Sequence, residues 1–291
     1  MPTPADSPEI SVIVPVRNGE RTLGSLLDSL ERQTLPRDRF EVIVVDNAST
    51  DATVPIARAR GATVLHEPIP SYSRPRNLGA SVARSVLYAF IDADCRADPR
   101  WLQALLECSS MAPLVAGEVK VTVSKRPNAI EKFETLWRFG QKWWVEQGWA
   151  ATANLLVHAD AFHAVGGFDP SWRYGGEDVD FCFRAAEAGF RLAYCSDAIA
   201  EHEGERMLGP MLRRCFRHGY AANQALHRLG FGHSAWRDPR PALSGDRALR
   251  QFGHTPDRFE PREWRRMARL ARLGYGVRVL GSAWAEVLRA R

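Results

Sequence analysis

The chain has 291 residues, 45% of them hydrophobic, so it can bury a substantial core and is not expected to be disordered. Its five cysteines are odd in number and form no C-x-x-C pair, which argues against a disulfide framework or a zinc site and fits a reducing cytoplasm. The sequence contains no signal-peptide pattern and no apolar run of 18 residues, so we expect neither export nor a membrane span. The net charge is −4 over residues 1–200 and +9 over residues 201–291, so we expect the basic last third to be a separate part of the molecule.

Up to residue 123, short apolar runs alternate with helical patterns. Strands are predicted at residues 10–16, 41–45, 62–66, 86–91 and 114–123. Helices are predicted at residues 21–33, 51–59, 76–83 and 99–108. This alternation indicates an α/β protein with a mostly parallel mixed sheet covered by helices on both faces.

The middle of the chain is less regular. Residues 128–147 are rich in aromatic side chains. These side chains belong either to the core or to a helix packed on the sheet, or they form the wall of a sugar or lipid pocket. A short helix is expected at residues 160–165 and a strand at 198–200. Helical patterns return at residues 208–220 and from Arg262 to Leu288, which predicts a helical C-terminal extension.

Two carboxylates follow the predicted strand at residues 86–91, in the segment Asp92-Ala93-Asp94. The carboxyl ends of strands in an α/β sheet are where ligand sites form. Mg²⁺ and Mn²⁺ favour oxygen ligands and are held by one or two carboxylates together with substrate phosphates. The same pattern also fits a turn or a helix N-cap, so both interpretations stay open.

A second acidic cluster, Glu177-Asp178, follows the paired glycines Gly175 and Gly176 and opens a predicted helix. The positive end of a helix dipole stabilises ionised carboxylates, so one of them could act as a general base. N-capping alone is the alternative. His202, which follows the strand at 198–200, is either a metal ligand or an ordinary structural histidine.

In this order, the motifs resemble those of the family 2 glycosyltransferases over about residues 10–205. The resemblance rests on Ser11 to Glu20 (SVIVPVRNGE), Val44 to Asp51 (VVDNASTD), Arg76 to Gly79 (RNLG), Phe90 to Cys95 (FIDADC) and Glu177-Asp178. It implies a GT-A fold, Rossmann-like and shared with nucleotide-diphospho-sugar transferases. It also implies transfer of a sugar from a nucleotide-sugar donor, with inversion at the anomeric carbon and with Mg²⁺ or Mn²⁺.

The resemblance further implies roles for individual residues. Asp178 would be the catalytic base, and Glu177 beside it would position the acceptor. Asp94 would bind the metal ion, and His202 would complete the coordination shell of that ion. The remaining matched positions would bind the nucleotide sugar, with Asp46 on the base, Arg76 near base or diphosphate, and Asp92 near ribose and metal waters. These positions are Pro15, Arg17, Asn18, Glu20, Asp46, Asn47, Arg76 and Asp92.

Family members often have tyrosine where this chain has Arg17, which leaves open whether that side chain stacks on the base or reaches a phosphate. A UDP-sugar is the first expectation for the donor. The domain division expected is a GT-A catalytic domain at residues 1–205, with a nucleotide-sugar half at about 1–110 and an acceptor half at about 111–205. Residues 206–291 would form the basic helical extension.

We therefore expect a metal-dependent, inverting glycosyltransferase acting on a hydroxyl of a saccharide or lipid-linked acceptor, in bacterial cell-surface polysaccharide or glycolipid biosynthesis. The basic helices are either a solvated surface or a peripheral contact with an anionic membrane on its inner, cytoplasmic face. Two alternative functions are a sugar-1-phosphate nucleotidyltransferase and a non-catalytic binder of sugar nucleotides or nucleic acid. This chain lacks the glycine-rich basic loop that nucleotidyltransferases have after their first strand. Binding of nucleic acid is not expected because the C-terminal arginines lie on predicted helices.

Overall fold

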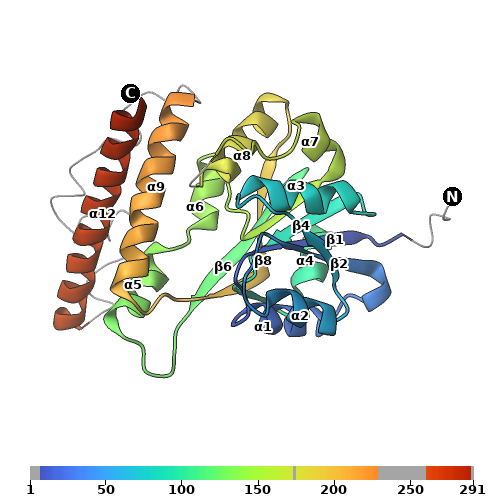
Figure 1. Ribbon diagram of the computed structural model, residues 1–291, viewed down its shortest axis with the longest axis horizontal. Helices are drawn as coiled ribbons and strands as arrows, with labels where there is room; N and C mark the ends of the chain where they lie inside the picture. Colours follow the sequence, from blue (N-terminus) through green and yellow to red (C-terminus); the bar gives the residue numbers. More distant parts are fainter. Residues whose placement is uncertain (1–6, 173–174, 229–259, 290–291) are drawn as a thin grey trace. The chain divides into compact units, whose positions relative to one another are not determined.

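The computed structural model describes residues 7–172, 175–228 and 260–289 (Figure 1). In the first part of the chain the elements are β1 (Ile10–Val16), α1 (Leu23–Leu30), the 3₁₀ turn η2 (Arg37–Arg39), β2 (Phe40–Asp46), α2 (Thr53–Ala59), β3 (Thr63–His66), α3 (Ser73–Val82), β4 (Leu87–Ile91), β5 (Cys95–Ala97), α4 (Trp101–Cys108) and β6 (Leu114–Thr122). The elements that follow are α5 (Ala129–Trp137), α6 (Gln141–Glu146), β7 (Asn154–His158), α7 (Ala159–Ala164), α8 (Glu177–Glu187), β8 (Leu192–Glu203), α9 (Leu208–Arg228) and α12 (Pro261–Arg289).

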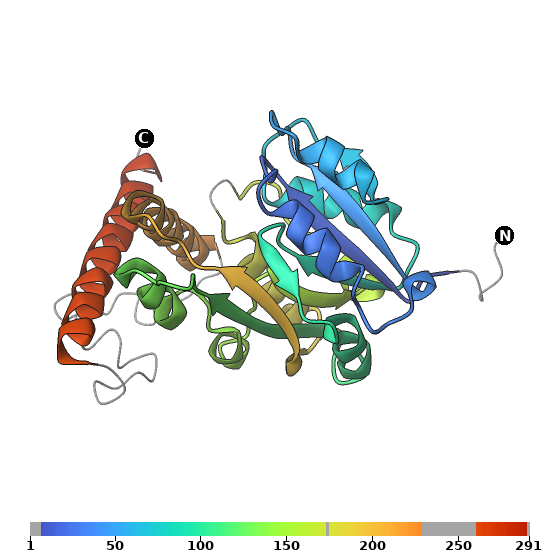
Figure 2. The ribbon, with the colours of Figure 1, turned by 90° about the horizontal axis from the view of Figure 1, so that it is seen from below.

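The described strands form a single mixed sheet in the order β3-β2-β1-β4-β7-β6-β8-β5 (Figure 2). Strands β1 to β4 pair in parallel. Strand β7 is antiparallel to both β4 and β6, and β5 is antiparallel to β8. The predicted α/β class with flanking helices is confirmed, although "mostly parallel" describes only the half of the sheet that contains β1 to β4. An apolar run indicates a buried strand but carries no information about its direction.

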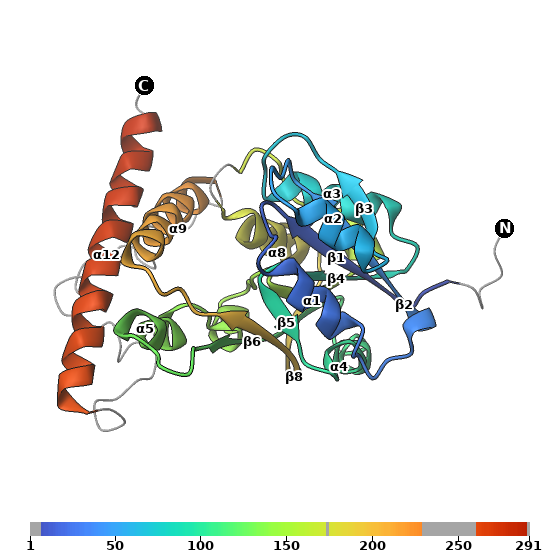
Figure 3. The same ribbon diagram turned by 60° about the horizontal axis from the view of Figure 1, so that its bottom comes forward.

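Helices cover both faces of the sheet, and β1 shows how the two layers divide (Figures 1 and 3). Successive side chains of a strand point to opposite faces. Val12 and Val14 pack in one core cluster with side chains of α1, α2 and α4. Ile13 packs in the other cluster with side chains of α3, α7 and α8. Because β1 is buried on both faces, its sequence is continuously apolar rather than alternating.

The structure adds several features that the sequence patterns did not indicate. The short strand β5 was not predicted, and β8 is longer than the strand expected at residues 198–200. The aromatic segment at residues 128–147 forms two helices, α5 and α6. Although the number and spacing of the cysteines argue against a disulfide framework, Cys108 of α4 and Cys195 of β8 form a disulfide. These two residues are 87 apart in sequence, so their spacing alone could not reveal the pair.

The chain divides into two compact units. The first, at residues 1–120, 141–173 and 177–202, contains the sheet except for the ends of β6 and β8. The second, at residues 121–140, 174–176 and 203–291, contains α5, α9 and α12. The functional division expected at residue 205 stays a prediction. Within the described residues, no helix is both long and apolar enough to cross a membrane.

In the second unit, α9 and α12 cross at a very short distance because glycines lie at the crossing. A Cβ added to Gly219 would lie 1.8 Å from the backbone oxygen of Arg278, and one added to Gly281 would lie 2.0 Å from that of Phe216. No side chain fits at either place. A small core of Phe133 from α5, Met211 from α9, and Trp264, Met267 and Ala271 from α12 completes the packing.

We expect Gly281→Ala to destabilise the chain by about 1 to 3 kcal/mol, because the new methyl group forces the two backbones apart. Gly276→Ala is the matched control on the same helix, since nothing lies within 4 Å of a Cβ at that position. It should stabilise the helix by up to about 1 kcal/mol through helix propensity. Urea denaturation followed by circular dichroism measures both effects. Equal effects of the two substitutions would contradict the close crossing.

Candidate active site

The acidic pair after β4 lies where the strand ends and the chain turns back. The amide of Cys95 donates a hydrogen bond to the backbone oxygen of Asp92 at 3.0 Å, which closes a turn that leads into β5. In the antiparallel β5–β8 pair, Cys95 lies opposite His202. This register places Asp94 Oδ2 3.0 Å from His202 Nε2. The Asp94 side chain is 44% exposed and that of His202 only 4%, so the carboxylate is accessible while the imidazole is held in place.

Arg76 of α3 connects the two acidic segments. Its Nη2 lies 3.0 Å from Asp92 Oδ1, and its Nη1 lies 3.2 Å from Glu177 Oε1. Nη1 also donates a hydrogen bond to the backbone oxygen of Tyr72 at 2.7 Å. Arg76 and Glu177 are both buried. The segments after β4 and at the start of α8 are 85 residues apart in sequence and meet through one guanidinium.

The position of Arg76 follows from how closely α3 approaches the sheet. A Cβ on Gly79 would lie 2.5 Å from Ile13 Cγ2, so glycine lets the helix rest directly on β1. One residue after Arg76, Asn77 exchanges two hydrogen bonds with the backbone of Phe168, donating from Nδ2 at 2.8 Å and accepting at Oδ1 at 2.9 Å. The hydroxyl of Ser73 donates to the backbone oxygen of Asp169 at 2.7 Å. Sequence reasoning assigned no role to Asn77 or Ser73, although Asn77 lies within the motif at residues 76–79.

Burial decides the protonation of the acidic pair that opens α8. Loss of hydration raises the pKa of Glu177 from 4.5 to about 7, with the neighbouring Asp178 charge acting in the same direction and Arg76 against it. Burial also raises the pKa of Asp178. The helix dipole was expected to stabilise both ionised forms, but desolvation is the larger effect here. A carboxylate with a raised pKa is a stronger base, which suits proton abstraction near neutral pH.

The contribution of Glu177 to the stability of the folded chain should therefore fall as the pH rises from 4.5 to about 7. The folded state binds the Glu177 proton more tightly than the unfolded state, so this contribution is complete below pH 4.5 and lost above about 7. A pKa difference of this size corresponds to about 3 kcal/mol. Glu177→Gln should remove that pH dependence in denaturation curves at acidic and alkaline pH, whereas the exposed Glu187→Gln should keep it. An unchanged pH dependence in Glu177→Gln would refute the raised pKa.

The loops after β1 and β2 hold each other through side chains predicted to bind the nucleoside. The amide of Asn18 donates to Ser49 Oγ at 2.8 Å, and Asn18 Oδ1 accepts from the amide of Thr50 at 2.8 Å. Glu20 Oε2 accepts from the amide of Ala52 at 3.2 Å. Asn18 and Ala48 have φ of 53° and 58°, in the left-handed region that residues other than glycine rarely adopt. These contacts hold the strained loops in one shape.

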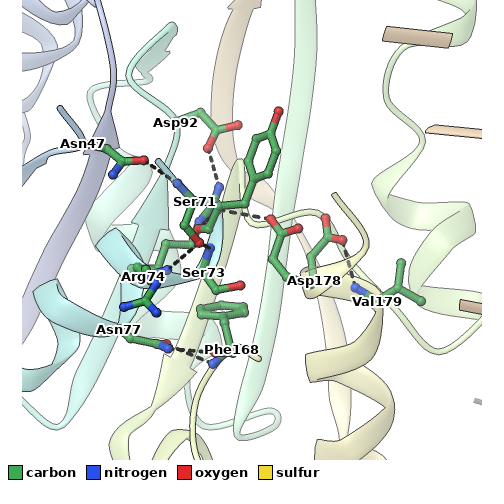
Figure 4. A network of polar contacts seen from close by, with 12 residues as sticks. Asn47, Ser71, Ser73, Arg74, Asn77, Asp92, Phe168, Asp178 and Val179 are labelled. Atoms are coloured by element: carbon green, nitrogen blue, oxygen red, sulfur yellow. Dashed lines mark hydrogen bonds and ion pairs between the residues drawn. The ribbon is translucent and has the colours of Figure 1, made fainter. Parts of the chain in front are cut away.

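Asp46 and Asn47, at the end of β2, organise neighbouring backbone. Asp46 is buried, with Oδ2 2.9 Å from His66 Nδ1 and Oδ1 accepting from the amide of Ser49 at 3.2 Å. Asn47 Nδ2 donates to the backbone oxygens of residues 67 and 69, and its Oδ1 accepts from the amide of Ser71 (Figure 4). Asn47 thus anchors the loop that leads into α3. Direct contact of either residue with a nucleotide stays a prediction.

The two other residues predicted for the donor pocket lie at the end of β1 and in the following loop. Pro15 is half-buried and Arg17 is exposed. The residues predicted to bind the nucleoside thus lie at the ends of β1 and β2. The acidic residues lie at the end of β4 and at the start of α8. In a parallel sheet these strand ends lie at one edge, which is where α/β proteins bind ligands.

The sequence comparisons identify the family. The profile described as glycosyl transferase family 2 matches residues 11–166, and that of glycosyl transferase family group 2 matches residues 89–285. The glycosyltransferase AglE of Haloferax volcanii is 32% identical over 222 residues, which cover 73% of this chain and 72% of AglE. The chain therefore belongs to glycosyl transferase family 2.

Other relatives agree with this result. A pre-mycofactocin glycosyltransferase of Mycobacterium tuberculosis is 30% identical over 243 residues, 77% of this chain and 50% of that protein. A validoxylamine A glucosyltransferase of Streptomyces hygroscopicus is 27% identical, over 72% of this chain and 56% of that protein. The chain thus spans only about half the length of these two relatives.

Solved structures support the GT-A fold. The mannosyltransferase PcManGT from Pyrobaculum calidifontis, in complex with GDP-Man and Mn²⁺, superposes with a TM-score of 0.60 at 20% identity, covering 99% of this chain and 77% of that one. S. aureus TarS 1-349 in complex with UDP-GlcNAc has a TM-score of 0.54 at 19% identity, covering 96% of this chain and 92% of that one. At these identities the similarity concerns the fold alone.

Proposed function

We propose that the chain is an inverting glycosyltransferase that moves a sugar from a nucleoside diphosphate to a hydroxyl of a saccharide or lipid-linked acceptor. The observation that carries this proposal is the double ion pair of Arg76 with Asp92 and Glu177, at 3.0 and 3.2 Å. It brings the candidate donor residues after β4 beside the candidate base at the start of α8. Family membership favours this function over the nucleotidyltransferase and the silent binder.

Asp178 is the proposed base. Its side chain lies in the first turn of α8, and its raised pKa suits removal of a proton from the acceptor hydroxyl as that oxygen attacks the anomeric carbon. Glu177, held by Arg76, would position the acceptor. A single base facing a diphosphate leaving group fits one displacement with inversion.

The donor set fits a divalent cation. Asp94 supplies an accessible carboxylate oxygen and His202 an imidazole nitrogen 3.0 Å away, and Mn²⁺ or Mg²⁺ bound there would draw its remaining ligands from the donor diphosphate. The described residues include no group of three His, Cys, Asp or Glu side chains that could hold a metal by themselves. When bound, the cation supplies Lewis-acid neutralisation of the departing phosphate oxygens.

The nucleoside would lie against the interlocked loops after β1 and β2, with Asp46 on the base and Arg17 reaching the base or a phosphate. The adjoining Pro15, Asn18, Glu20 and Asn47 would shape this pocket, and Asp92 would lie near the ribose. UDP is the proposed nucleotide. We also propose a role in bacterial cell-surface polysaccharide or glycolipid biosynthesis.

Thermal unfolding with UDP, GDP or dTDP, each with and without Mn²⁺, tests the donor proposal. We expect one nucleotide with Mn²⁺ to stabilise the wild-type chain by about 2 to 3 kcal/mol at a concentration near one hundred times its Kd. Asp94→Asn should abolish the part that depends on Mn²⁺, while Asp38→Asn, an exposed aspartate near β2, should leave it intact. Protection by none of the nucleotides, or equal protection of Asp94→Asn, would refute the assignment.

A further inference from the structure

Helix α12 has two faces of different character. Its inward positions recur every three or four residues and contact α9 and α5. The inward set is Trp264, Met267, Ala271, Gly274, Gly281 and Ala285. The opposite face is exposed along the described helix. We call this exposed side the outer face of α12.

The outer face changes chemistry along its length. Its N-terminal half presents exposed arginines, and its C-terminal half presents exposed apolar side chains. The arginines are Arg265, Arg266, Arg269 and Arg272. The apolar residues are Leu273 (44% exposed), Val279 (46%), Leu280 (63%) and Trp284 (49%). Exposed apolar side chains of this size on one helix face indicate an interaction surface.

The two halves meet at a hollow of 590 Å³ on α12. It is lined by Arg269, Arg272, Leu273, Gly276, Val277 and Leu280. From residue 264 to residue 285 the sequence contains no acidic residue, and Glu263 at the start of the helix pairs with Lys132 of α5. The expected partner is therefore anionic where it meets the first half of the outer face and apolar where it meets the second half.

We propose that the outer face of α12 docks on an anionic lipid bilayer, with the arginines among the headgroups and Leu280 and Trp284 among the upper acyl chains. A bilayer surface combines a negative outer layer and an apolar interior within a few ångströms. A second copy of the chain would bring arginines of one face near those of the other. A nucleic acid would match the arginines but leave the apolar half in water.

Docking would hold the chain at the surface where a lipid-linked acceptor is embedded. Only this consequence rests on the proposed function. The lipid contact itself depends on α12 and requires no residue of the candidate active site. The two proposals can therefore fail separately.

The test is vesicle co-sedimentation of the full chain. Wild type should bind phosphatidylcholine vesicles containing about one third phosphatidylglycerol and not pure phosphatidylcholine. Arg269→Gln with Arg272→Gln should weaken binding about 25-fold, at about fivefold for each arginine. Leu280→Gln with Trp284→Gln should weaken it at least about tenfold. The matched controls are the exposed Arg100→Gln and Val86→Gln in the first unit, which should bind as wild type.

A depth measurement adds an independent readout. Lipids brominated in the upper acyl chain should quench tryptophan fluorescence in wild type, and Trp284→Phe should lose most of that quenching. All outer-face variants should keep wild-type donor turnover, whereas Asp178→Asn should lose turnover and bind vesicles normally. Equal binding to neutral and anionic vesicles, undiminished binding by the outer-face variants, or an outer face used only for dimerisation or RNA binding would each overturn the proposal.

Discussion

Asp178→Asn should reduce sugar transfer by about a hundredfold to ten-thousandfold, because an amide cannot take the proton of the acceptor hydroxyl. The substitution is nearly isosteric, and it removes one of the three carboxylates in the first turn of α8. Stability should not fall, since loss of the Asp178 charge lowers the cost of ionising Glu177. Donor affinity in the presence of Mn²⁺ should stay close to wild type.

Transfer rates measured by nucleotide release, together with a calorimetric titration of the donor nucleotide, separate these two effects. Burial raises the pKa of Asp178 above the ordinary aspartate value of 3.8. In wild type the transfer rate should therefore begin to fall with decreasing pH before the pH reaches 3.8. Asp197→Asn, at an exposed aspartate of β8, is the control and should be active. Wild-type transfer by Asp178→Asn would remove that residue from the role of base.

Arg76→Met should lower the free energy of unfolding by about 3 to 5 kcal/mol at pH 8, because it leaves buried carboxylate charge without its cation. The loss should be smaller at pH 5, where Glu177 takes up a proton at little cost. Transfer should also fall at both pH values, since Asp92 and Glu177 lose the group that holds them together.

Adding Glu177→Gln to Arg76→Met tests the electrostatic explanation. The double variant should regain much of the stability lost at pH 8, because no buried charge remains at position 177. Arg100→Met is the matched control, since Arg100 forms an exposed pair with Glu107 and should cost about 1 kcal/mol or less. A loss in Arg76→Met that is identical at pH 5 and pH 8 would indicate a packing effect instead.

The parallel half of the sheet was predictable because its strands are buried on both faces and read as continuous apolar runs. Strand β1 was expected at residues 10–16 and is found at Ile10–Val16. Strand β5 has only three residues and no run to detect. The disulfide between Cys108 and Cys195 depends on how α4 packs against β8, which no local pattern encodes.

The candidate site shows the same limit. Sequence motifs singled out Asp92, Asp94 and Glu177-Asp178, but not the contacts that join them. The pairing of Asp94 with His202 follows from the β5–β8 register, and the bridge through Arg76 follows from the close approach of α3 to β1. Motif reasoning placed Arg76 near the donor, while the structure shows it paired with two carboxylates. Both relationships arise from tertiary packing.

Anomalous diffraction from crystals soaked with Mn²⁺ and the donor found in the nucleotide screen tests the central claim most directly. We expect a manganese peak within bonding distance of Asp94 and His202, a diphosphate beside it, and the anomeric carbon of the sugar facing the Asp178 carboxylate. A manganese peak at any other place, or a sugar turned away from Asp178, would contradict a single site built from the two acidic segments.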